Sequence, residues 1–124
     1  MLGTCAPVAF ILTADAPRAK SFYAETLGLK FTSQDDYALV FDANGITVRV
    51  SLSPGFTPAQ HPVFGWFVPD IVQTATALAG AGITFEKYPF LEQDELGIWT
   101  SPDGAAKVAF FKDPDGNVLS ITQA

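Results

Sequence analysis

Apolar and polar residues alternate along several short segments of this chain. In residues 46–52 every second residue is apolar, and the residues between them are polar, with Arg49 at the centre. Residues 118–122 show a similar split, in which Leu119 and Ile121 alternate with Val118, Ser120 and Thr122. A two-residue period is that of a strand with one buried face. The pattern therefore predicts strands that pack one face on a core and leave the other free to line a cavity.

Two longer stretches carry helix signals instead. The first begins at Asp15 as the N-terminal cap, has Pro17 in its first turn and ends before Gly28. The second begins after Asp70 and ends near Gly82. The first helix has an apolar stripe at helical spacing, formed by Ala19, Phe22, Tyr23 and Leu27. Both helices need a sheet to cover that apolar side.

Turn-forming residues divide the remainder into short strands. Asn, Asp, Pro and Gly gather at 42–45, 101–104 and 113–116, where hairpins need residues with positive or fixed φ. Apolar strands are predicted before each helix, within residues 8–14 and 63–68. The other predicted strands cover residues 30–34, 37–42, 45–52, 84–88, 97–100, 106–111 and 117–122.

The same order of segments occurs twice in the chain. A strand, an acidic helix cap, a helix, a glycine and further strands follow one another in residues 8–50 and again in 63–121. In each copy the capping aspartate follows the first valine of the strand by seven residues. We therefore predict a single α+β domain made by duplication. Its parts are a first module at about 6–53, a linker at about 54–62 and a second module at about 63–124.

Composition narrows the functional classes. Hydrophobic residues make up 48% of the 124 residues, enough for a core without disulfides. Thirteen acidic against seven basic residues give a net charge of -6, which disfavours nucleic acid as a partner. Cys5 is the only cysteine, so an intrachain disulfide is excluded and a reducing, cytoplasmic location is expected. The apolar run at 8–12 is too short for a membrane span, and no membrane partner is expected.

Two sequence motifs carry a family resemblance that covers nearly the whole chain. One is Asp15 followed by SFY at 21–23 and LGL at 27–29; the other is FKDPDGN at 111–117. In this order and spacing the sequence resembles the vicinal oxygen chelate superfamily of glyoxalases, bleomycin resistance proteins and extradiol dioxygenases. The resemblance implies two tandem βαβββ modules. Their mainly antiparallel sheet curls into a cup, with a helix on the outer face of each module.

The resemblance also implies where a divalent metal would be held, because catalytic relatives bind one in the cup. The four ligand positions fall on Val8, Arg49, Val63 and Ser120. None of these is a usual metal ligand, and the chain has one His and one Cys. His61, next to Pro62, is interpreted as an exposed linker residue. We therefore predict no metal and no other cofactor.

The predicted cup is mainly apolar, which favours a small organic ligand. Arg49 is its exception, a cation able to bind an anionic or carbonyl oxygen. Trp99, near the loop 92–97, offers a flat stacking surface, whereas Trp66 is expected in the core. Tyr88 and Phe90 are further stacking candidates. The predicted ligand-binding residues are Val8, Phe10, Arg49, Val63, Phe67, Trp99 and Ser120.

Three functional classes stay open at this point. The first is a metal-independent protein that binds or sequesters a small aromatic or amphipathic, for instance antibiotic-like, molecule. The second is an enzyme of the lyase or isomerase type with a non-standard metal site or none, which the missing ligands disfavour. The third is an interaction module whose cup is vestigial. Relatives frequently dimerise, so the resemblance also implies a homodimer.

Overall fold

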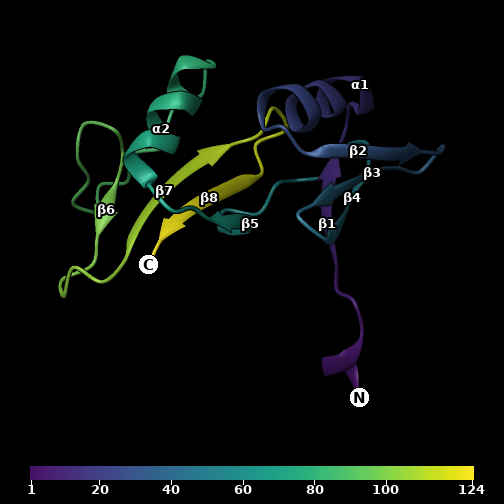
Figure 1. The fold of residues 1–124 in the computed structure, drawn as a ribbon. Helices are drawn as coiled ribbons and strands as arrows, with labels where there is room; N and C mark the ends of the chain where they lie inside the picture. Colours follow the sequence, from purple (N-terminus) through teal and green to yellow (C-terminus); the bar gives the residue numbers. More distant parts are fainter. The chain divides into compact units, whose positions relative to one another are not determined.

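The computed structural model describes residues 1–124 and contains two compact units, residues 1–58 and residues 59–124. Each unit has a four-stranded mixed sheet and a helix on one of its faces (Figure 1). Neither sheet closes into a barrel, since each has two edge strands. The predicted α+β class with two βαβββ modules is confirmed.

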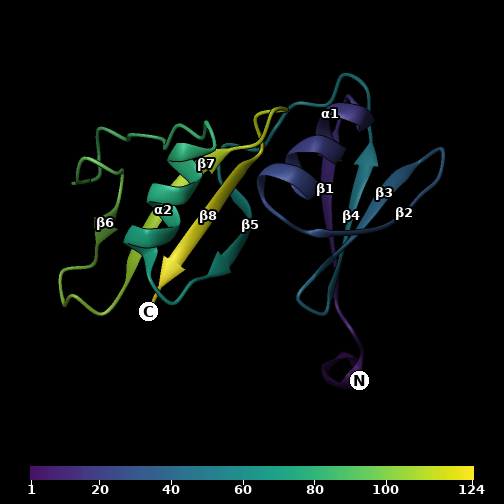
Figure 2. The same cartoon turned by 45° about the horizontal axis from the view of Figure 1, so that its top comes forward.

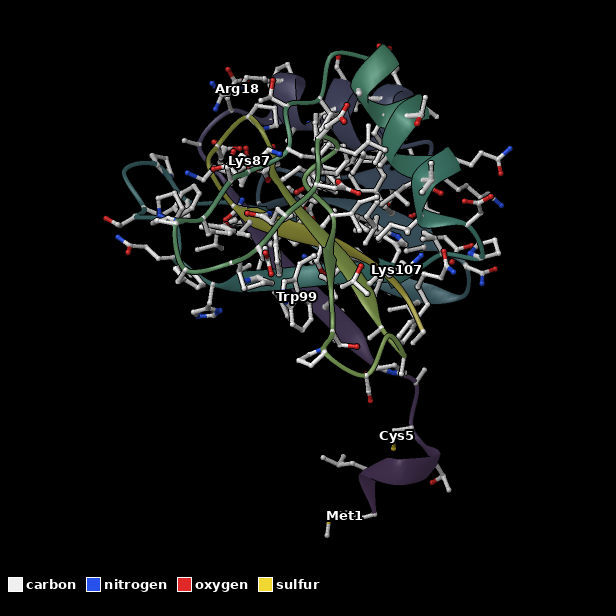
Figure 3. The ribbon with its side chains drawn as sticks, turned by 90° about the vertical axis from the view of Figure 1, so that its left-hand side faces the viewer. Met1, Cys5, Arg18, Lys87, Trp99 and Lys107 are labelled. Carbon is white, nitrogen blue, oxygen red and sulfur yellow. The ribbon has the colours of Figure 1, made fainter.

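The sheet of the first unit has the strand order β1-β4-β3-β2. Its strands are β1 (Val8–Thr13), β2 (Lys30–Gln34), β3 (Ala38–Ala43) and β4 (Ile46–Leu52). β1 pairs parallel with β4, and the other two pairings are antiparallel. A short 3-10 helix, η1 (Leu2–Thr4), precedes the sheet and is fully exposed. Figure 3 shows Met1 and Cys5 on this segment, which extends away from the sheet.

The helix of the first unit begins with the predicted cap. The Asp15 carboxylate accepts a hydrogen bond from Arg18 N at 3.1 Å, and α1 (Ala16–Lys20) follows. It continues as a wider π-helical segment, η2 (Ser21–Thr26), in which Leu27 N donates to Phe22 O at 2.9 Å. This helix packs on β3 and β4. The core beneath it contains Ala19, Phe22, Tyr23, Leu39, Phe41, Val48 and Val50.

The second unit repeats this arrangement with the strand order β5-β8-β7-β6. Its elements are β5 (Pro62–Phe67), α2 (Ile71–Gly80), β6 (Trp99–Thr100), β7 (Lys107–Lys112) and β8 (Val118–Gln123). α2 lies across β7 and β8 (Figure 2). The core under it contains Ile71, Ala75, Phe85, Ala109, Phe111, Leu119 and Ile121. No helix combines the length and the apolar character that crossing a membrane requires.

The edge strand of the second sheet differs from the prediction. Residues 84–88 do not form a strand, and only Phe85 bridges to Phe111 on β7. The predicted strand at 97–100 shortens to β6, which pairs with the other end of β7. The edge of the sheet beside β7 therefore consists of two short pieces, Phe85 and β6, and the loop 87–98 connects them. Pro89 in this loop has no N–H to donate to a sheet, which disfavours a continuous strand here.

Candidate functional site

The second sheet has one face under α2 and one face away from it, which we call the open face. Cross-strand partners share a face, so the strand register identifies the side chains of the open face. One row across the sheet consists of Trp99, Val108, Thr122 and Phe67. The next row consists of Phe110, Ser120 and Gly65. The residues between them in sequence, such as Ala109 and Ile121, are buried under the helix.

A hollow next to this face, which we call the aromatic pocket, has a volume of about 240 Å³. Its lining residues are Gln60, His61, Pro62, Tyr88, Phe90, Leu91 and Phe110. The Tyr88 ring stacks on Phe90 at a centroid distance of 5.4 Å and meets Phe110 edge-on at 5.6 Å. Phe90 is 78% exposed, so one wall of the pocket presents an uncovered aromatic ring. The pocket is suited to a flat, apolar molecule.

A second, shallower hollow of about 190 Å³ lies on the same face, and we call it the hydroxyl depression. Its lining residues are Gly65, Trp66, Phe67, Ser120 and Thr122. It adjoins the aromatic pocket because Phe110 and Ser120 are direct cross-strand partners. The open face therefore combines an aromatic and a hydroxyl-lined recess side by side.

The loop 87–98 places Tyr88 and Phe90 over β7, and Gln93 holds it closed. The Gln93 amide oxygen accepts a hydrogen bond from Tyr88 N at 2.8 Å. Its nitrogen donates to Glu86 O at 3.0 Å and to Gly97 O at 2.9 Å. Lys87 Nζ donates to Asp94 O. The Gln93 side chain, in the middle of the loop, is thus bonded to the backbone at both ends of the loop.

The polar border of the aromatic pocket affects the Tyr88 phenol. Burial raises the pKa of Tyr88 above its usual value, and the nearby Glu86 carboxylate adds to this effect, whereas Lys112 opposes it. Lys112 forms an ion pair with Glu86 at 3.4 Å. The Tyr88 hydroxyl is therefore a neutral hydrogen-bond donor across the physiological pH range.

The open face of the first sheet also carries predicted site residues. Phe10, which is 60% exposed, lies beside Arg49 in the β1–β4 pairing, and the exposed Val8 lies beside Thr47. Two backbone N–H groups, of Tyr37 and Ala38, lower the pKa of Asp35, and the positive charge of Arg49 contributes further. Arg49 is thus a half-buried cation with an apolar neighbour in its own sheet.

The predicted ligand-binding residues are distributed over both units. Phe67, Trp99 and Ser120 lie on the open face of the second sheet. Figure 3 shows Trp99 and Lys107 on the neighbouring strands β6 and β7. Val63 is exposed and lies at a register shift in β5, so it has no cross-strand partner in these rows. Trp66 is half-buried and meets Phe64 edge-on at 5.0 Å. Its cross-strand partner is the core residue Ile121, which places the Trp66 side chain on the face under the helix.

Sequence reasoning missed five residues that line the aromatic pocket: Gln60, His61, Pro62, Leu91 and Phe110. His61 is exposed, as expected, and its Nδ1 lies 3.1 Å from Pro62 O. Phe110 had a usable signal, because it alternates with the core residues Ala109 and Phe111. Leu91 had none, since only the folded loop brings it to the pocket.

The residues at the four metal-ligand positions of the family do not fit a divalent cation. Val8 and Val63 have no donor atom, and Arg49 is itself a cation. Ser120 offers one hydroxyl. Nowhere in the chain do three His, Cys, Asp or Glu side chains gather in a group able to hold a metal.

Comparison with known proteins extends these observations. The family model described as Glyoxalase/Bleomycin resistance protein/Dioxygenase superfamily matches residues 4–121. No curated protein matches the chain.

Among solved structures, a superfamily member from Sphaerobacter thermophilus DSM 20745 has 20% identity over 100% of both chains, with a TM-score of 0.75. A glyoxalase family protein from Enterococcus faecalis has 21% identity over 98% of this chain and 99% of that one, with a TM-score of 0.75. Lactoylglutathione lyase from Agrobacterium tumefaciens has 14% identity over 98% of this chain and 94% of that one, with a TM-score of 0.74. These likenesses establish the shared fold.

Proposed function

This chain belongs to the glyoxalase/bleomycin resistance protein/dioxygenase superfamily, and from that premise we propose that it is a metal-independent binding protein for a small aromatic or amphipathic molecule. The ligand lies on the open face of the second sheet, with its ring in the aromatic pocket. The scaffold hosts many activities, so the site has to support the assignment.

The aromatic pocket is the observation that supports this proposal. The Tyr88 ring contacts the rings of both Phe90 and Phe110, all three line a hollow of about 240 Å³, and Phe90 is 78% exposed. A ligand ring that covers Phe90 removes apolar surface from water and gains an aromatic contact. Pockets for drug-sized molecules start at about 300 Å³, so a compound of one or two rings matches this volume.

The donor chemistry of the chain favours binding over metal-dependent turnover. The family's four ligand positions carry Val8, Arg49, Val63 and Ser120, which do not form a site for a Lewis-acidic cation. Sequestration needs affinity and no reacting group. The stacked rings and the adjoining hydroxyls are sufficient for that role.

Thermal unfolding of metal-stripped protein tests the proposal with planar aromatic, carboxylate-bearing and antibiotic-like compounds, each beside divalent metals. A ligand that binds only the folded state raises its stability, by about 2.7 kcal/mol at one hundred times its Kd. We expect a rise with at least one aromatic compound and none with metals. A rise with a divalent metal alone would contradict metal independence and favour an enzyme.

Single substitutions then locate the binding site. Phe110→Ala should weaken the binding of the aromatic compound, because Phe110 lines the aromatic pocket. Trp99 lies on the same face but lines neither hollow, so Trp99→Ala should weaken binding, by more than about tenfold, only if its ring stacks on the ligand. Tyr37→Ala is the control, because Tyr37 is an aromatic residue of the first unit, 77% exposed and outside the proposed site. If Phe110→Ala folds normally and binds the aromatic compound with unchanged affinity, the ligand does not bind on this face.

A further inference from the structure

Gly65 lies within β5, at a position where a strand residue normally has a side chain. A Cβ atom there would lie 2.3 Å from Ser120 Oγ and 2.8 Å from Ser120 O. The Ser120 hydroxyl therefore occupies the space that a side chain at position 65 would fill. A glycine inside a strand often marks a site where another group approaches the backbone closely.

Two hydroxyl groups face the depression next to Gly65. Ser120 and Thr122 are two residues apart on β8, so their side chains lie on the same face. Both line the hydroxyl depression, and neither side chain takes part in a hydrogen bond within the chain. Each hydroxyl can donate one hydrogen bond and accept others. Their bonding capacity is open to a ligand or to water.

The charged groups of the second unit indicate what kind of ligand group suits these hydroxyls. Lys112, on the open face, is paired with Glu86 at 3.4 Å. Lys107 shares its face with the core residue Ala109, two positions on, and Lys87 donates to Asp94 O. No lysine of this unit is thus available to neutralise an anion in the depression. An uncharged polar group is the better match.

The short distance between the hydroxyl depression and the aromatic pocket determines how far the polar group of the ligand can be from its ring. Ser120 is the direct cross-strand partner of Phe110, and such partners have Cβ atoms about 5 Å apart. A ring seated against Phe110 therefore brings its own first substituent to Ser120. A polar group joined to the ring by a long flexible linker would extend past the hydroxyl groups of the depression.

We infer that Ser120 and Thr122 form a specificity subsite for a neutral hydrogen-bonding group, such as a carboxamide or ketone, attached directly to the aromatic ring of the ligand. This inference rests on the proposed function, because it names the chemistry of the molecule in the same site. Ser120 and Thr122 bind the substituent, and Tyr88, Phe90 and Phe110 bind the ring.

Three naphthalenes of matched shape test the subsite on the intact chain: naphthalene-2-carboxamide, naphthalene-2-carboxylate and 2-ethylnaphthalene. Tryptophan fluorescence gives the Kd of each. Wild type should bind the carboxamide about tenfold more tightly than either analogue, as two net hydrogen bonds allow. The double variant Ser120→Ala and Thr122→Val should lose this preference and keep its affinity for 2-ethylnaphthalene. Thr100→Val removes a hydroxyl from the other face of the same sheet and should change nothing.

The possible results separate the subsite from the proposed function. If the double variant weakens all three naphthalenes equally, or if wild type prefers the carboxylate, the subsite is wrong while the binding role stands. If 2-ethylnaphthalene and the carboxamide both bind and the double variant keeps their ratio, Ser120 and Thr122 do not select the ligand. If none of the three binds wild type, the aromatic pocket itself is not a ligand site, and both inferences fail.

Discussion

Asn117 donates two hydrogen bonds to the carboxylate of Asp113, from its side-chain Nδ2 at 2.8 Å and its backbone N at 2.9 Å. Asp115 N donates a third at 3.0 Å. Asp113 and Asn117 are 5% and 4% exposed, so this network lies in a nearly water-free setting. It forms the turn between β7 and β8 and thereby fixes the register that places Phe110 beside Ser120.

Replacing Asp113 by Ala should lower the free energy of unfolding by about 2 to 3 kcal/mol, since buried donors lose their acceptor. Urea unfolding measures the change. Asp103→Ala is a suitable control, because Asp103 accepts a backbone hydrogen bond in an exposed turn. Equal losses of unfolding free energy in the two variants would show that burial of the Asp113 network does not add to its contribution to stability.

Gly65→Ala should destabilise the chain by about 1 to 3 kcal/mol, because the new methyl group would overlap Ser120. Adding Ser120→Gly removes the 2.3 Å contact with Oγ but leaves the 2.8 Å contact with the backbone oxygen, so it should recover part of the loss. Gly80→Ala in α2 meets nothing within 4 Å and should be neutral or slightly stabilising. A neutral Gly65→Ala would contradict the close approach of the two strands.

Gln93→Ala should release the loop 87–98. The variant loses three hydrogen bonds to the loop backbone, which corresponds to about 1.5 to 4 kcal/mol of stability. Hydrogen exchange should accelerate at Tyr88, whose N–H loses its acceptor, and remain slow in β8. Gln34→Ala, at an exposed position of β2, is the matched control. Unchanged exchange at Tyr88 would mean that other contacts hold the loop.

The phenol of Tyr88 should titrate above its usual pKa of 10.0, because burial and Glu86 both favour the neutral form. Since the pKa is raised on folding, the folded state retains the proton longer. The contribution of Tyr88 to stability is therefore complete below the unfolded pKa and is lost as the pH rises through the folded one. The tyrosinate absorbance of wild type minus that of Tyr88→Phe measures the midpoint. A midpoint at or below the usual value would contradict the assigned environment.

Local sequence signals predicted those parts of the fold that depend on neighbouring residues. Asp15 and Asp70 cap their helices through backbone N–H groups three residues on, as their positions indicated. The edge strand of the second sheet was predicted wrongly. Residues 84–88 have strand-like composition, but only Phe85 bridges to β7, and the backbone that follows it bonds to the Gln93 side chain instead. Gln93 satisfies the backbone of Glu86, Tyr88 and Gly97 in a way that no local pattern indicates.

The candidate site could be predicted where it lies on regular strands. Alternation in β8 placed Ser120 on the face away from the helix, where the structure has it. Val63 could not be placed, because a register shift between Pro62 and Phe64 interrupts the alternation. In the loop 87–98, the aromatic rings of Tyr88 and Phe90 marked them as stacking candidates. Leu91 could not be predicted, because it reaches the pocket through folding of the loop itself, which leaves no periodic signal in the sequence.

Closure of the loop 87–98 by Gln93 has a consequence for how this protein can evolve. The Gln93 side chain bonds the backbone oxygens of Glu86 and Gly97, at the two ends of the loop. These bonds hold the segment from Tyr88 to Glu92 in place whatever its own side chains are. Mutations at Phe90 or Leu91 can alter the wall of the aromatic pocket without disturbing the pairing of β7 and β8. Changes at these two positions can therefore alter ligand preference while the residues that build the scaffold stay the same.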